Sequence, residues 1–264
     1  MPVPSITLGA ERPPSPARLA AADYDNRAAD KYAKSDFTGA LADADKAIAL
    51  DPTFAWPFAR RGGIKNALGD VEGALQDASR AIELDPNFVL GFTVRGQSRR
   101  RMRDYAGSLE DYSRAIALTP KVAEGYFNRA ATRLEMRDFD GATSDTNQAL
   151  ELDPAAPLAF RNRAIARLGK GDRNGAEADF GRAIDAGPND PGNYTNRAKF
   201  RMDERKDYDG AIADCTKAIE LAPDYAQAFH YRGTAKKAKG DGFGAIDDLD
   251  RALQLESPSA GTPR

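Results

Sequence analysis

Two residue types that build catalytic and metal sites occur only once each in the chain, as Cys215 and His230. A nucleophilic thiol needs a base beside it, and a transition-metal site needs several histidine, cysteine or carboxylate ligands. No carboxylate stands at ligand spacing from His230, and a single cysteine excludes an intramolecular disulfide. A glycine-rich phosphate-binding loop is lacking as well. The sequence therefore predicts that the chain is not an enzyme and that it holds no metal and no cofactor.

Charged side chains are far more numerous, but their signs nearly cancel. The 264 residues include 38 lysines and arginines and 40 aspartates and glutamates, which leaves a net charge of −2. Such a balance argues against strong attraction to nucleic acid or to an anionic membrane. The densest basic run, Arg95–Arg103, has no interleaved aromatic residues for stacking on bases. We therefore expect no nucleic-acid partner.

The start of the chain and its hydropathy bear on where the protein works. The first residues, MPVPSITLGAERPPSPARL, lack the basic start and the apolar block of a secretory signal. The sequence also lacks a run of about eighteen apolar residues that could span a bilayer. We predict a cytoplasmic protein with no membrane span, or a periplasmic one if the start is processed.

The sequence repeats with a period of 34 residues. The proline of motifs such as ALDP, ELDP and ELAP marks the period, with spacings of 34, 34, 34, 34 and 35 residues. Placing that proline at position 32 defines seven repeats, at residues 21–54, 55–88, 89–122, 123–156, 157–190, 191–225 and 226–256. The extra residue of the sixth repeat falls in residues 202–206, between two helices. The proline-rich residues 1–20 are predicted to form a disordered arm, and residues 257–264 a disordered tail.

Each repeat has the residue spacing of two helices. Position 4 is always aromatic, position 8 is always Ala or Gly, and position 27 is always Ala. Positions 4, 8 and 11 share one helical face and positions 17, 20, 24, 27 and 28 another, which predicts helices over positions 2–14 and 17–30. An Asp at position 16 is placed to cap the second helix, and the proline ends it. One hairpin alone leaves apolar faces uncovered, so the seven are expected to stack.

These columns resemble the tetratricopeptide repeat family, whose motif has an aromatic residue at position 4, small residues at 8, 20 and 27, and proline at 32. The resemblance covers residues 21–256. It implies an all-α fold, a right-handed superhelical solenoid of seven helix-turn-helix hairpins whose first helices line a concave groove. It also implies a protein or peptide partner, and no small-molecule substrate.

Three charged columns depart from that family motif. Position 7 is Arg, position 11 is Lys or Arg, and position 23 is Asp in all seven repeats. An Arg at a usually apolar position needs a partner, and the Asp column on the facing helix supplies one. We predict Arg–Asp pairs, within a repeat or between neighbours, rather than a row of anion-binding arginines. Position 19 is Gly throughout, which indicates either a close approach of other atoms or recent duplication of a neutral choice.

The groove positions implied by the resemblance supply the candidate binding residues. Asn128, Asn162 and Asn196 occupy position 6 of three consecutive repeats, and their amides have the donors and the acceptor to hold the backbone of an extended peptide. This row resembles the asparagine ladder of the repeats in O-linked N-acetylglucosamine transferases, although Asn is also common at this position in the family. Aromatic and basic residues nearby are typical interface anchors, namely Trp56, Phe127, Tyr231, Arg60, Arg100, Arg101 and Arg161.

Two further features bear on the partner. The five-residue carboxylate clamp of co-chaperone members of the family has no match in any frame centred on the three asparagines, so we do not expect a receptor for chaperone tails. The second helix of the last repeat carries Ile246, Leu249 and Leu253, and no further amphipathic helix follows it. We expect this end to self-associate or to dock on another protein.

The leading functional prediction is a non-catalytic adaptor that holds an extended peptide or a partner helix in the groove. The alternatives are an assembly scaffold that works through its ends and convex face, and a regulatory subunit of a separate enzyme. Binding in the groove predicts that Asn162→Ala and Trp56→Ala weaken capture of the partner with little change in melting temperature. Scaffolding predicts that capture survives these two substitutions and fails when Leu249 or Leu253 is replaced.

Overall fold

The computed structural model describes residues 14–256, and all regular secondary structure within that span is helical. In chain order the α-helices are α1 (Pro16–Ala33), α2 (Phe37–Leu50), α3 (Ala55–Leu68), α4 (Val71–Leu84), α5 (Val89–Arg101), α6 (Tyr105–Leu118), α7 (Ala123–Glu135), α8 (Phe139–Leu152), α9 (Pro157–Gly169), α10 (Arg173–Ala186), α11 (Pro191–Phe200), α12 (Tyr208–Leu221), α13 (Ala226–Lys239) and α14 (Gly242–Glu256). A π-helical turn, η1 (Arg201–Arg205), continues α11. The prediction of an all-α fold of seven helical hairpins is confirmed.

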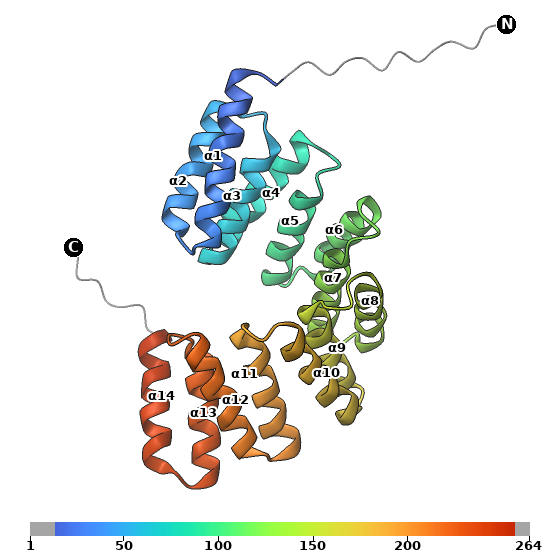
Figure 1. The fold of residues 1–264 in the computed structure, drawn as a ribbon. Coiled ribbons are helices and arrows are strands. Elements are labelled where there is room, and N and C mark those ends of the chain that lie inside the picture. The colour runs from blue at the N-terminus through green and yellow to red at the C-terminus, as the bar shows by residue number, and fades with distance from the viewer. Residues whose placement is uncertain (1–13, 257–264) are drawn as a thin grey trace, which may run out of the picture. The chain divides into compact units, whose positions relative to one another are not determined.

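The chain forms two compact units, one up to Thr119 with α1–α6 and one from Pro120 with α7–α14. Within each unit, the two helices of a repeat pack as a hairpin, and the second helix of one hairpin packs on the first helix of the next (Figure 1). First helices of neighbouring hairpins also touch, as α1 does with α3 and α7 with α9. Within each unit, the first helices of successive hairpins therefore form a shared surface.

The same capping interaction occurs at the start of the second helix of every hairpin. The carboxylate of the Asp at position 16 accepts a hydrogen bond from the backbone N–H of the Gly at position 19, at 2.9–3.0 Å. A Cβ atom on that Gly would lie only 2.0–2.3 Å from the Oδ2 atom of the same Asp. The invariant glycine is therefore explained by a close approach, and the capping predicted for the Asp is confirmed. The pairs are Asp36–Gly39, Asp70–Gly73, Asp104–Gly107, Asp138–Gly141, Asp172–Gly175, Asp207–Gly210 and Asp241–Gly244.

The sixth repeat absorbs its extra residue inside a helix rather than between two helices. The π-helical turn η1 lengthens the first helix by one residue, and Lys206 then ends it with φ of 55°. Its side chains reach back to α10, where Glu204 pairs with Arg173 at 2.6 Å and Arg205 pairs with Glu177 at 2.7 Å. The insertion thus adds polar contacts between the fifth and sixth repeats.

The first helix begins earlier than the repeat boundary at residue 21 suggested. The side chain of Ser15 caps α1 by accepting a hydrogen bond from the backbone N–H of Arg18 at 3.1 Å, and proline occupies the first helical position. Residues 16–20, which we assigned to the disordered arm, are therefore helical. Residues 1–13 of that arm and the tail 257–264 lie outside the described residues.

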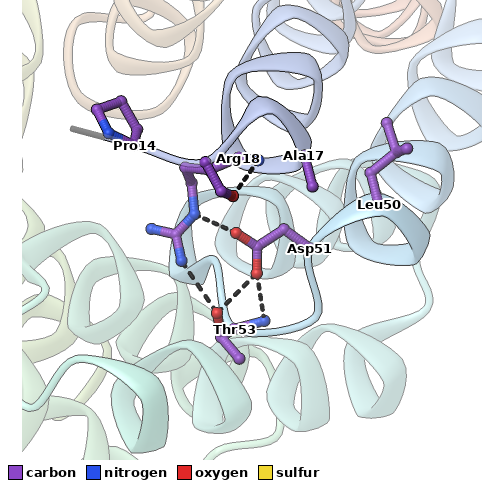
Figure 2. A pocket seen from close by; sticks show the side chains of 7 residues that line it. Pro14, Ala17, Arg18, Leu50, Asp51 and Thr53 are labelled. Atoms are coloured by element: carbon purple, nitrogen blue, oxygen red, sulfur yellow. Dashed lines mark hydrogen bonds and ion pairs between the residues drawn. The ribbon is translucent and has the colours of Figure 1, made fainter. Parts of the chain in front are cut away.

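An ion pair ties the start of α1 to the turn between α2 and α3. The guanidinium of Arg18 donates to the carboxylate of Asp51 and, at 3.0 Å, to the hydroxyl of Thr53 (Figure 2). It also lies over the ring of Phe54, 4.6 Å from its centre. The hydrogen bond from Arg18 lowers the pKa of Asp51 to about 2. Arg18, Asp51 and Thr53 line an open pocket of about 560 Å³ together with Leu50. The charged groups of this pocket are bonded to one another, so we assign it no ligand.

Candidate binding surfaces on the first helices

Inside every hairpin, the Asp at position 23 is held by two cations of the facing helix. The Arg at position 7 and the Lys or Arg at position 11 both reach it, and all seven repeats have both contacts within 3.4 Å. We call this arrangement the two-cation clamp. Its aspartates are Asp43, Asp77, Asp111, Asp145, Asp179, Asp214 and Asp248, each buried. The predicted Arg–Asp pairing is confirmed and lies within each repeat.

The arginines of the clamp are engaged by its buried carboxylate. In the fifth repeat, Arg163 contacts both oxygens of Asp179, at 2.8 and 2.9 Å, and Arg167 adds a third contact at 2.7 Å. In the seventh, burial alone would raise the pKa of Asp248, but hydrogen bonds from Arg232 and Lys236 hold it below its usual value. The clamp is therefore a structural element that fixes the two helices of each hairpin.

On the first unit, Trp56 of α3 forms one wall of a small pocket. Its side chain is 46% exposed and meets the ring of Phe88 edge to face, with 5.0 Å between the ring centres. At the same pocket, Arg60 donates to both oxygens of Asp25 in α1, at 2.7 and 2.8 Å. The pocket has a volume of about 190 Å³, and its lining residues are Ala22, Asp25, Asn26, Phe54, Trp56 and Arg60.

The structure brings Trp56 and Arg60 together at one pocket and adds a partner of Arg60 that the sequence analysis missed. Asp25 is 3% exposed and neutralises Arg60, so the pocket has no net positive charge at its floor. A signal was present in the sequence, because Asp25 is the single acid in its column and Arg60 the single arginine in the next column, one repeat later.

The other two arginines predicted for this surface lie near the end of α5. Arg101 is exposed and donates to the backbone carbonyl of Asn66 in α3. Arg100 is half-buried. Asn66 itself is buried and donates to the hydroxyl of Ser98 at 2.9 Å. These contacts join α3 to α5 and place Arg101 at the far end of the helices from Trp56.

On the second unit, the three asparagines of the predicted ladder have different environments. Asn162 is 8% exposed, and its amide donates to the backbone carbonyl of Phe127 on the neighbouring first helix at 3.0 Å. The amide of Asn196 donates within its own helix, to the carbonyl of Gly192 at 2.7 Å. Asn128 is half-buried, and its amide makes no hydrogen bond within the described residues. Asn162 therefore joins α9 to α7, whereas the amide donors and acceptor of Asn128 stay available to a ligand.

The remaining predicted residues of this unit lie on its first helices. Phe127 is half-buried and packs on a cluster that includes Ala149, Ala156 and Ala159. The guanidinium of Arg161 lies 3.8 Å from the carboxylate of Asp190. Tyr231 is half-buried against the core between α12 and α13, and its hydroxyl accepts a hydrogen bond from Gln227 at 3.2 Å.

The structure also places Cys215 and His230, the two residues that the sequence analysis considered first. Cys215 is fully buried in α12, and this burial raises the pKa of its thiol to about 12, which keeps it protonated. His230 is exposed beside Tyr231. Among residues 14–256, no group of three or more His, Cys, Asp or Glu side chains is arranged to hold a metal ion. Of the helices described, none combines the length and the apolarity that a membrane span requires.

Comparison with known sequences gives a consistent result over part of the chain. The family model of the tetratricopeptide repeat matches residues 193–225. A bovine (Bos taurus) protein named tetratricopeptide repeat protein 36 is 38% identical over 61 residues, which are 23% of this chain and 32% of that protein. The mouse (Mus musculus) protein of the same name is 40% identical over 55 residues, 21% of this chain and 30% of that one. The chain thus matches about a third of the length of these relatives.

Solved structures extend the likeness to nearly the whole fold. A tetratricopeptide repeat protein from Parabacteroides merdae has a TM-score of 0.68 and 19% identity, covering 91% of this chain and 95% of its own. The yeast protein Tom70 has a TM-score of 0.70 and 22% identity, covering 92% of this chain and 51% of its own. At these identities the likeness concerns the fold, which is a tandem array of helical hairpins in each case.

Proposed function

We propose that the chain is a tetratricopeptide repeat protein and that it works as a non-catalytic adaptor for protein–protein interaction, which holds an extended peptide or a partner helix on the first helices of its repeats. The observation that carries the proposal is the pocket at Trp56. A large aromatic side chain that is 46% exposed beside a small pocket is a typical anchor point of an interface.

The lining of that pocket favours a neutral, partly apolar peptide segment. Trp56 and Ala22 offer apolar walls, and the Arg60–Asp25 pair leaves no net charge to attract a free carboxylate. The bidentate contact occupies one edge of the Arg60 guanidinium, and the remaining N–H groups suit a neutral acceptor such as a peptide carbonyl. The exposed amide of Asn26 adds a second donor and an acceptor.

On the second unit, Asn128 supports the same mode of binding. Its half-buried amide has two donors and one acceptor that no described residue uses, next to the half-buried ring of Phe127. An amide of this kind binds the backbone of an extended peptide and does not depend on the peptide's sequence. Asn162 differs, because its bond to the carbonyl of Phe127 already uses one of its donors.

The test separates binding from folding by comparing Asn128 with Asn162. We expect Asn162→Ala to lower the free energy of unfolding by about 1 kcal/mol, because the hydrogen bond to Phe127 is lost. Asn128→Ala should change it by less than about 0.5 kcal/mol, since no internal hydrogen bond is lost. Urea unfolding followed by circular dichroism measures both. This revises our expectation from sequence that Asn162→Ala leaves stability nearly unchanged.

Binding is then measured with proteins captured from the source cell by the full chain. Trp56→Ala and Asn128→Ala should each reduce the captured amount of the same partner. Met136→Ala is the matched control, because Met136 is 47% exposed and lies at the end of α7. A partner that all three variants retain in full would overturn the proposed binding surface.

A further inference from the structure

The outer face of α14 presents three large apolar side chains to solvent. Phe243 is 89% exposed, Ile246 is 57% exposed and Leu253 is 62% exposed. Their spacings of three, seven and ten residues place them on one side of the helix. Phe243 stands at position 18, where the six earlier repeats have small or polar residues, namely Thr38, Glu72, Ala106, Asp140, Asn174 and Asp209. This face, defined by Phe243, Ile246 and Leu253, is called the end face below.

The same face is covered by a helix elsewhere in the second unit. On α12, the equivalent Ile212 packs in a cluster with Ala235 and Tyr231 of α13. Ile184 of α10, which corresponds to Leu253, is 9% exposed. The end face therefore retains side chains suited to packing against a helix, although none of the described residues covers it. The eight residues that follow Glu256 contain no Leu, Ile, Val, Met, Phe, Tyr or Trp.

Charge at the end face argues against a second copy of this chain as its occupant. Asp250 lies between Ile246 and Leu253 on the face, and Asp247 borders it; both are exposed. Two end faces in contact would bring Asp250 close to its own copy. Like charges at an interface are costly.

Contact with the other end of a second copy has the same difficulty. On α1, the positions that pack on a preceding hairpin in later repeats are Asp23 and Asp30, both exposed. The second repeat has Pro57 and Ile64 there, and both are buried. The outer side of α1 therefore has two exposed carboxylates where the second repeat has buried apolar residues, and these carboxylates would meet the acidic border of the end face.

We propose that the end face docks an amphipathic helix of another protein, with an apolar stripe over Phe243, Ile246 and Leu253 and basic residues beside Asp247 and Asp250. This surface is separate from the first-helix surfaces of the proposed function. The chain itself provides a suitable probe. The α13 sequence, residues 226–239, covers the equivalent face of α12 and carries four cations and no acid.

The experiment uses a fluorescent peptide with the sequence of residues 226–239, held helical by a hydrocarbon staple on its polar side. Its anisotropy is titrated with the full chain at two ionic strengths. We expect saturable binding that weakens at high salt, because the acidic residues beside the apolar stripe are exposed. A peptide in which its three lysines are replaced by glutamate should bind at least tenfold more weakly.

Variants assign the binding to the end face. Phe243→Asn with Leu253→Gln should weaken binding at least tenfold, and the exposure of both side chains means that the fold is retained. Asp250→Asn should reduce the preference for the basic peptide over the acidic one. Leu68→Gln is the matched control, since Leu68 is 52% exposed on α3, and Trp56→Ala reports on the separate surface of the proposed function. Both should bind the peptide as the unaltered chain does.

Three results would overturn the proposal. The first is that the Phe243→Asn, Leu253→Gln variant binds the basic peptide as well as the unaltered chain does, and the second is that the unaltered chain does not bind it. The third is sedimentation of the unaltered chain as a dimer that this double variant converts to a monomer, because a second copy would then occupy the end face.

Discussion

Two sets of ion pairs in this molecule can be compared, one inside the hairpins and one around α1 in the first unit. The two-cation clamp recurs in all seven hairpins, with the same residue types at the same repeat positions. The Arg60–Asp25 and Arg18–Asp51 pairs occur once each and join α1 to its neighbours. Pairs of the first kind follow the 34-residue period and determine how a hairpin packs, whereas those of the second kind shape one local surface.

The clamp and the Arg18–Asp51 pair also differ in solvent exposure. The Asp of the clamp is buried on all sides and touches at least two cations, as Asp179 does at 0% exposure. Arg18 is 35% exposed, and its pair with Asp51 is open to water and salt on one side. A buried carboxylate that loses its charge leaves its partners uncompensated, whereas a surface pair contributes less because water screens it. The comparison therefore predicts a graded set of effects on stability.

The largest effect is expected for Asp179→Asn in the clamp. The substitution keeps the shape of the side chain but leaves Arg163 and Arg167 without their counter-charge. We expect the free energy of unfolding to fall by about 3 kcal/mol, measured by urea unfolding. Asp224→Asn is the control, because Asp224 is exposed in a turn, and it should change the free energy by less than about 0.5 kcal/mol. Equal effects of the two substitutions would contradict a structural role for the clamp.

The hairpins and the clamp were predictable from the sequence because each of them repeats. A column of Asp facing a column of Arg predicts their pairing, although the sequence left open whether each pair lies within a repeat or between neighbours. The Gly at position 19 left two explanations open in the sequence. The structure was needed to choose between them, because only the structure shows the Asp carboxylate close to the place where a Cβ atom would stand.

Features that occur once were harder to predict. No second copy of Asp25 exists to show that it pairs with Arg60, and the donor contact of Asn162 depends on the distance between α7 and α9. The start of α1 was placed at residue 21 by the period, yet Ser15 and the following proline begin the helix earlier. The π-helical turn in the sixth repeat likewise depends on contacts with α10 that the spacing alone does not contain.

A smaller effect is expected from two alanine substitutions in α10, which test the capping of the hairpins. Gly175→Ala places a Cβ 2.0 Å from the Oδ2 atom of Asp172 and displaces the cap, so we expect a loss of about 1 kcal/mol. Gly181→Ala meets nothing within 4 Å and should stabilise the helix by about 0.5–1 kcal/mol. Thermal and urea unfolding of both variants measures the difference. If Gly175→Ala also stabilised the chain, the glycine column would be a neutral product of duplication.

The smallest effect is expected for the surface pair of Arg18 and Asp51, and it depends on pH. The pKa of Asp51 is about 2 in the folded chain, below its ordinary value of 3.8. A lowered carboxyl pKa stabilises the folded state above about pH 4, and this contribution is lost as the pH falls from about 4 towards 2. Because the pair is partly exposed, we expect Arg18→Gln to cost about 0.5 kcal/mol at pH 6, less in high salt. The difference between the unaltered chain and the variant should shrink towards zero near pH 2. Urea unfolding at several pH values measures it, with Arg80→Gln as the control, since Arg80 forms an exposed pair with Glu83. A difference that stays constant from pH 6 to pH 2 would mean that Asp51 does not owe its low pKa to Arg18.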